Sequence, residues 1–271
     1  MLDDLPTDII EMLVSFLLYP TMLACTCKYM YRLKRNLRLS LQDYNKYIDN
    51  DESFMRLFNS DLFNNKLIVL ELDLTNIDNI ILDYISDMKN LNILSLINYN
   101  GVSIPSLLNI KELYVQGCNN IETLSNSPSI VLLNIYMCNV IKQILLSNLE
   151  ELSIANCDNI ENIDNLENII KLDITNCNKL KKITNFSKLK ILYIYKCDNL
   201  EIISQMDNLN ILDINNCKII ISLRHIPELI ELYINNCNNL THIYGYFYKL
   251  KILIINGNNC IKNFMDLTIF I

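Results

Sequence analysis

Several residue types on which catalytic and metal sites depend are nearly missing from this chain. Its 271 residues include no tryptophan, two histidines and four glycines. The glycines form no phosphate-cradling motif. The histidines, His225 and His242, have no nucleophile or metal-ligand pattern around them. The sequence therefore predicts no catalytic, cofactor-binding or metal-binding residue, and we expect a protein that is not an enzyme.

An excess of basic charge is also missing. Lysine and arginine total 23 against 30 aspartate and glutamate residues, so the formal net charge is −7. Proteins that bind nucleic acid neutralise phosphates with many basic side chains, so no nucleic-acid partner is expected. We interpret the basic cluster from Lys28 to Arg38 as a solvated helix face. The abundance of Asn, Ile, Leu and Lys suggests an AT-rich genome, such as that of a large DNA virus or a protist.

No long apolar run is present either. The longest, Met12 to Cys25, is interrupted by Ser15 and Pro20 and is shorter than the roughly 20 residues of a membrane-spanning helix. No membrane partner is expected. The opening Met1-Leu2-Asp3-Asp4 lacks the basic region of a signal peptide. We therefore expect a cytoplasmic protein, in the host cell's cytoplasm if the source is viral.

What is present is a repeat marked by seven cysteines. They recur every 19 or 20 residues, at Cys118, Cys138, Cys157, Cys177, Cys197, Cys217 and Cys237. Aliphatic residues stand eight, five and three positions before each cysteine and three and six positions after it. Around Cys157 these residues are Leu149, Leu152, Ile154, Ile160 and Ile163. A constant apolar frame predicts stacked copies of one structural unit.

The frame extends beyond the cysteines in both directions. Asn258 occupies the cysteine slot on the C-terminal side, and Tyr99 and Thr75 occupy it on the N-terminal side, giving ten repeats from Leu67 onward. The pattern L-x-x-L-x-L-x-x-[NC]-x-L resembles the leucine-rich repeat. The resemblance implies an α/β solenoid, a horseshoe with a parallel concave β-sheet and short convex turns.

The L-x-L core of each repeat has a period of two, which predicts a short strand with one buried side. The cysteines would then form one buried column beside the strands. Because pairing them would distort a regular stack, we expect free thiols rather than disulfides. Residues four and two positions before each cysteine slot should point outward and bind a partner. The candidates are Tyr114, Tyr136, Asp173, Tyr193, Tyr195, Asp213 and Tyr233, although aromatic residues also suit exposed strands through cross-strand pairing alone.

The first 66 residues lack the frame and show helical spacing instead. Ile9, Leu13 and Leu17 recur every four residues, and Pro20 separates this stretch from a second one, Thr21 to Leu33. The segment from residue 34 to 65 is expected to continue as helix, since its apolar residues fall on two stripes. We therefore divide the chain into a helical module (1–40), a helical linker or cap (41–66) and the repeat solenoid (67–271).

The helical module resembles an F-box. The pattern is Leu5-Pro6-x-Asp8-Ile9-Ile10-x-x-Leu13-x-x-x-Leu17, followed by Leu23 and by Cys27-Lys28-Tyr29-x-Tyr31-x-Leu33, with a slightly short stretch between Leu17 and Cys27. The resemblance covers residues 2–35 and implies docking on a Skp-family adaptor and, through it, on a cullin-RING ubiquitin ligase. The adaptor contacts that it implies are Leu5, Pro6, Ile9, Ile10, Leu13, Leu17 and Leu23.

Two functions follow from these patterns. In the first, the protein is a non-enzymatic substrate receptor of a cullin-RING ubiquitin ligase, whose repeats hold an unknown target protein. In the alternative, it is a leucine-rich-repeat interaction scaffold with a helical cap and no role in ubiquitination. A monomer without cofactors is expected in both cases. Co-purification with a Skp-family adaptor separates the two hypotheses.

Overall fold

The computed structural model describes residues 37–41, 67–73, 82, 85–86 and 88–257, apart from 164–165, 205, 225 and 246. The seven expected adaptor contacts, from Leu5 to Leu23, lie outside the described residues, as do His225 and Asn258. The expected F-box contacts therefore stay a prediction.

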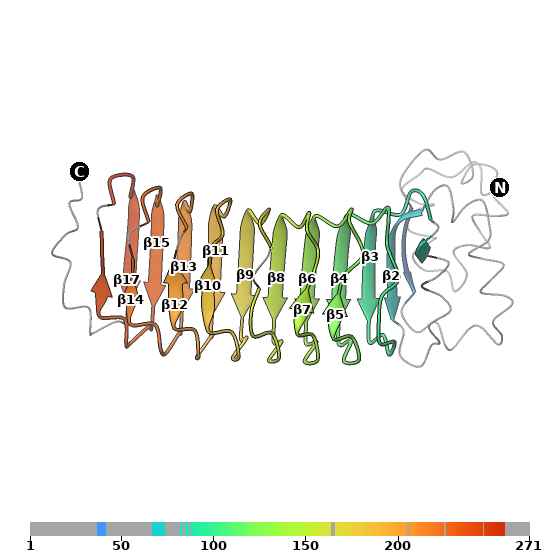
Figure 1. The fold of residues 1–271 in the computed structure, drawn as a ribbon, viewed down its shortest axis with the longest axis horizontal. Helices are drawn as coiled ribbons and strands as arrows, with labels where there is room; N and C mark the ends of the chain where they lie inside the picture. Colours follow the sequence, from blue (N-terminus) through green and yellow to red (C-terminus); the bar gives the residue numbers. More distant parts are fainter. Residues whose placement is uncertain are drawn as a thin grey trace, which may run out of the picture.

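The described chain is a parallel β-solenoid built around one long sheet (Figure 1). The main sheet has 11 strands in the order β1-β2-β3-β4-β6-β8-β9-β11-β13-β15-β17, and each strand pairs in parallel with its neighbours. Its strands are β1 (Leu37–Leu41), β2 (Leu67–Asp73), β3 (Ile93–Ile97), β4 (Glu112–Gln116), β6 (Leu132–Tyr136), β8 (Glu151–Ala155), β9 (Lys171–Thr175), β11 (Ile191–Tyr195), β13 (Ile211–Asn215), β15 (Glu231–Asn235) and β17 (Ile252–Asn256).

The strand register follows the repeat frame of the sequence. Leu152 of β8 pairs with Leu172 of β9, which pairs with Leu192 of β11, so equivalent leucines lie side by side along the sheet. The predicted strand in each L-x-L core is confirmed from β3 to β17. Each coil of the solenoid is one repeat of the sequence.

The start of the sheet corrects one prediction. We expected residues 34–65 to be helical, but Leu37–Leu41 forms the strand β1, and it crosses the expected boundary at residue 40. The segment alternates leucine with Arg38 and Ser40, a period of two that suits a strand. Leu39 pairs with Leu70 of β2 and Leu41 with Leu72, so β1 extends the leucine register backward by one strand.

Three small two-stranded parallel sheets complete the coils on the side away from the main sheet. They pair β5 (Thr123–Leu124) with β7 (Gln143–Ile144), β10 (Lys182–Thr184) with β12 (Ile202–Ser204), and β14 (Ser222–Leu223) with β16 (His242–Ile243). Between Ile93 and Asn256 the described residues contain no helix. This confirms the prediction of short turns and extended segments there. The described part of the chain holds no helix with the length and apolarity of a membrane span.

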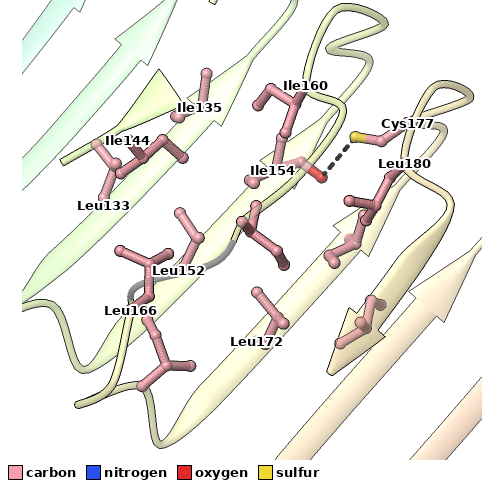
Figure 2. Packing of buried hydrophobic residues seen from close by; sticks show 14 of the residues in the cluster. Leu133, Ile135, Ile144, Leu152, Ile154, Ile160, Leu166, Leu172, Cys177 and Leu180 are labelled. Atoms are coloured by element: carbon pink, nitrogen blue, oxygen red, sulfur yellow. Dashed lines mark hydrogen bonds between the residues drawn. The ribbon is translucent and has the colours of Figure 1, made fainter. Parts of the chain in front are cut away.

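The core is a continuous column of aliphatic side chains that runs through the stack. The second and fourth residues of each five-residue strand from β3 to β17 point inward, and in β8 these are Leu152 and Ile154, exposed by 2% and 1%. Figure 2 shows them packing against Leu133 and Ile135 of β6, Leu172 of β9 and residues of the far side such as Ile160 and Leu166. Because one coil buries its apolar residues mainly against its neighbours, the column depends on stacking.

The seven repeat cysteines form the thiol column, the line of buried sulfurs next to the strands. All seven are free and 0% exposed, which confirms the prediction. Sγ of Cys177 lies 3.8 Å from the carbonyl oxygen of Ile154 in the previous coil, and Figure 2 marks this weak hydrogen bond. Burial raises the pKa of Cys157 and of Cys197 to about 11. These two thiols therefore stay protonated near neutral pH and pack as small apolar groups.

The residue after each main-sheet strand from β3 to β17 has a positive φ, between 52° and 67°. This turn slot holds Asn98, Gly117, Met137, Asn156, Asn176, Lys196, Asn216, Asn236 and Gly257. Asparagine and glycine tolerate the left-handed conformation, whereas other residues pay about 1 kcal/mol or more. At Gly117 a Cβ atom would also clash with Oδ1 of Asn98 from the previous coil. The turn slot therefore selects small and amide side chains.

Asparagine ladders join the coils outside the core. Nδ2 of Asn199 donates a hydrogen bond to the carbonyl oxygen of Asn178 at 2.7 Å, and Asn239 repeats the contact with Lys218 at 2.6 Å. On the other edge, Asn168 donates to the carbonyl oxygen of Ser147 at 2.8 Å. These side chains satisfy turn carbonyls that the sheet hydrogen bonds do not reach.

Candidate partner-binding face

The outward-pointing side chains of β3 to β17 form a single surface, which we call the sheet face. Each strand contributes its first, third and fifth residues, which are half-buried or exposed in every strand from β3 to β17. The parallel register therefore arranges them in three rows across the strands: a first row, a middle row and a rim row beside the turn slot.

The seven predicted partner-binding residues all lie on the sheet face. Five of them belong to the middle row, which reads Tyr114, Asn134, Ser153, Asp173, Tyr193, Asp213 and Tyr233 from β4 to β15. The other two, Tyr136 and Tyr195, belong to the rim row and are each 40% exposed. Residues that are far apart in the sequence are thus brought into two adjacent rows of one surface.

The first row was missed by the sequence analysis, which read only the positions four and two residues before the cysteine slot. The residue six positions before it points to the same side, because side chains alternate along a strand. This row contributes most of the charge of the sheet face. Its charged members are Glu112, Glu151, Lys171 and Glu231.

Two tyrosines of the middle row are held by carboxylates of the first row. The hydroxyl of Tyr114 donates a hydrogen bond to Glu112 Oε2 at 3.1 Å, and that of Tyr233 donates to Glu231 Oε2 at 2.9 Å. The hydrogen bond with Glu231 raises the pKa of Tyr233. Both rings are therefore fixed in place while their faces stay on the surface.

The two aspartates of the middle row are only partly solvated. Burial raises the pKa of Asp173, an effect that Lys171 partly offsets. Burial also raises the pKa of Asp213, which accepts a hydrogen bond from Nδ2 of Asn215. The raised values mean that the ionised carboxylates lack part of the stabilisation that water gives an exposed aspartate.

The sheet face is hollowed over β6, β8 and β9. The hollow has a volume of about 270 Å³, and the small side chain of Ser153 lies among its lining residues. Other lining side chains are Tyr114, Asn134, Glu151, Lys171 and Asp173. A polar depression with aromatic and charged walls can take one side chain from a docked protein.

The two exposed tyrosines of the rim row coincide with the two exceptions in the turn slot. Only Met137 and Lys196 break the asparagine or glycine rule of the turn slot, and each directly follows a rim tyrosine, Tyr136 or Tyr195. The ammonium group of Lys196 lies 5.2 Å from the centre of the Tyr195 ring, a cation–π distance. A large side chain in a strained slot thus accompanies both exposed aromatic rings.

The described residues of the sheet face include no cysteine or histidine. His242 lies in β16 on the far side, where its ring stacks on Tyr244 and its Nδ1 is 2.8 Å from the hydroxyl of Thr241. Within the described part of the chain, no three His, Cys, Asp or Glu side chains group in a way that could hold a metal ion.

Neither a scan against protein-family models nor a search of curated proteins found a match to this chain. The resemblances to the F-box and to the leucine-rich repeat therefore depend on the residues quoted above.

Proposed function

We propose that this protein is a non-enzymatic binding protein whose sheet face captures a partner protein. The observation that carries the proposal is the placement of Tyr114, Asp173, Tyr193, Asp213 and Tyr233 in one row of an outward surface. From β3 to β17 that surface runs about 38 Å, at about 4.8 Å per strand. Tyrosine is favoured at protein interfaces because it gives a large contact area at a low entropic cost.

Within this proposal the coils are leucine-rich repeats, and the sheet face is the concave side of their horseshoe. The support is the repeat pattern of the sequence together with the parallel solenoid. We further propose that residues 1–40 act as an F-box, so that the protein is a substrate receptor of a cullin-RING ubiquitin ligase. The support for that role is the pattern from Leu5 to Leu33. The alternative remains an interaction scaffold with a helical cap.

Capture of the partner is tested with Tyr193→Ala/Tyr195→Ala/Tyr233→Ala. We expect this variant to lose the proteins that the wild type captures from lysate of the cells in which it is expressed, as quantified by mass spectrometry. Tyr244→Ala/Tyr248→Ala is the matched control, because these tyrosines are 51% and 66% exposed and lie outside the sheet face. Equal capture by the wild type and the sheet-face variant would refute the proposal.

The adaptor role is tested with a purified Skp-family adaptor. We expect the wild type to bind it and Leu5→Ala/Ile9→Ala to lose binding, while the variant still captures the partner. Val102→Ala/Leu108→Ala removes exposed aliphatic groups from the solenoid instead, since these residues are 74% and 59% exposed, and should bind normally. A wild type that does not bind the adaptor would favour the scaffold.

A further inference from the structure

The charge of the sheet face is strongly one-sided. From β3 to β17 it carries the carboxylates of Glu112, Glu151, Asp173, Asp213 and Glu231, and its single basic residue is Lys171. Nζ of Lys171 lies 3.6 Å from Glu151 Oε2, so that charge is already balanced within the chain. Among the described residues, no lysine or arginine forms a salt bridge with the other four carboxylates.

Three of those four carboxylates accept hydrogen bonds from neutral donors, while the charge of Lys171 acts on the fourth, Asp173. Glu112 and Glu231 accept tyrosine hydroxyls, and Asp213 accepts an amide. An ionised carboxylate has about four acceptor sites, so each keeps room for a further donor. The two aspartates are also partly desolvated, and the pKa of each is raised by burial. A cationic group placed against them would replace the missing solvation.

Cationic groups could be placed at two positions of the sheet face, beside Asp173 and beside Asp213. Asp173 lines the hollow over β6, β8 and β9, where Lys171 is already paired with Glu151. Asp213 lies two strands further along the middle row, about 10 Å away at 4.8 Å per strand, and Tyr193 lies between the two aspartates in register. A tyrosine ring between two carboxylates suits a lysine or arginine, because its face attracts cations.

We propose that the sheet face recognises a basic, extended segment of the partner protein, with one lysine or arginine side chain in the hollow at Asp173 and another at Asp213. This inference rests on the proposed function and names the chemistry of the partner. A polyproline-type segment matches the spacing, since every third side chain points the same way and three residues span about 9.3 Å. Arginine can pair with a carboxylate through two hydrogen bonds, and lysine through its compact charge.

A labelled peptide of Lys-Pro-Pro repeats is the probe, titrated into the full chain while fluorescence anisotropy is measured. We expect the peptide to bind and its affinity to fall as salt is added. A peptide of Glu-Pro-Pro repeats should not bind. Asp173→Asn/Asp213→Asn, which nearly preserves side-chain shape, should weaken binding by at least about tenfold, because charge-assisted contacts are lost.

The control is Glu161→Gln/Glu201→Gln, which removes the same charge from exposed residues outside the main sheet. It should change the affinity by less than about twofold, because exposed charges far from the contact are screened by salt. Equal weakening in both variants would show attraction to net charge alone and would overturn the inference, as would a wild type that does not bind the lysine peptide. Circular dichroism melting of both variants verifies that they are folded.

The failure of this inference differs from the failure of the proposed function. If the tyrosine variant loses its captured partner and Asp173→Asn/Asp213→Asn retains it, the sheet face binds a partner that is not basic. The inference then fails and the proposed function stands. If both variants retain the partner, both proposals fail.

Discussion

The two sides of the same strands differ in how strictly the sequence repeats. Inward positions hold leucine, isoleucine or valine in every strand from β4 to β15, and the thiol column adds one cysteine to each of those coils. Outward positions change from coil to coil, from Ser153 and Ala155 in β8 to Tyr193 and Tyr195 in β11. The inward side maintains one fold, since close packing tolerates few changes. The outward side is not under this packing constraint, so its residues can vary from coil to coil.

The largest predicted difference in unfolding free energy is between two substitutions by aspartate, one on each side of the same strand. Leu192 is 0% exposed and its neighbour Tyr193 faces outward. Leu192→Asp buries an unpaired charge and should cost more than about 5 kcal/mol of unfolding free energy. Tyr193→Asp should cost about 1 kcal/mol or less. Urea unfolding measures both, and similar costs would contradict the assignment of sides.

A second contrast uses pH to test the buried thiols of the inward side. Burial raises the pKa of Cys157 and Cys197 to about 11, above the value of about 8.5 in an unfolded chain. The stability that these buried thiols contribute is fully present below about pH 8.5. As the pH rises toward 11, the unfolding free energy falls by about 1.4 kcal/mol per pH unit for each thiol. Urea unfolding at pH 7 and pH 10 should show this loss in the wild type.

The control for the pH effect is Cys157→Ala/Cys197→Ala. This variant is less stable at pH 7, because each substitution leaves a cavity, but it should lose less stability between pH 7 and pH 10. The difference between wild type and variant isolates the thiols from lysines and tyrosines that titrate in the same range. An identical loss in both would mean that the thiols are not buried in solution.

The asparagine ladders should contribute less than the core. Asn199→Ala removes the 2.7 Å hydrogen bond to the carbonyl oxygen of Asn178 and should cost about 1 kcal/mol of unfolding free energy. Asn162→Ala is the comparison, because Asn162 is exposed and makes no hydrogen bond to another described residue. Chemical denaturation should give a lower unfolding free energy for Asn199→Ala than for Asn162→Ala. Equal values would show that the asparagine ladder does not stabilise the fold.

The smallest effect should be a gain in stability. Met137 adopts a φ of 54°, and Met137→Asn should raise the unfolding free energy by up to about 1 kcal/mol, because asparagine tolerates this conformation. Leu145→Asn is the matched control, since Leu145 is 53% exposed but does not have a positive φ. A thermal melting point that rises equally in both variants would refute strain at the turn slot.

The regular part of this fold could be predicted from the sequence because the apolar pattern that produces it is periodic. Alternating Leu152 and Ile154, with Cys157 three residues later, recur in coil after coil, so strands, buried side and thiol column all follow from one pattern. The strand β1 was missed because Leu37 and Leu41 are four residues apart. That spacing fits a helix stripe as well as a strand, and only pairing with β2 decides between them.

The candidate site was predicted in part for a similar reason. The outward positions followed from strand periodicity, but the first row was overlooked. The hollow depends on side-chain sizes in four neighbouring strands. The turn slot had a visible signal in the Asn-Cys pairs such as Asn156-Cys157 and Asn176-Cys177. Met137 and Lys196 concealed that signal, because a positive φ is a property of the backbone that their identity does not suggest.

Photo-crosslinking of the captured partner from defined positions tests the central claim most directly. A photoreactive phenylalanine analogue replaces either Tyr195 on the sheet face or Tyr244 on the far side, which are 40% and 51% exposed. We predict that the partner crosslinks from position 195 and not from position 244. Crosslinking from position 244 alone, or equally from both, would contradict the claim that the sheet face holds the partner.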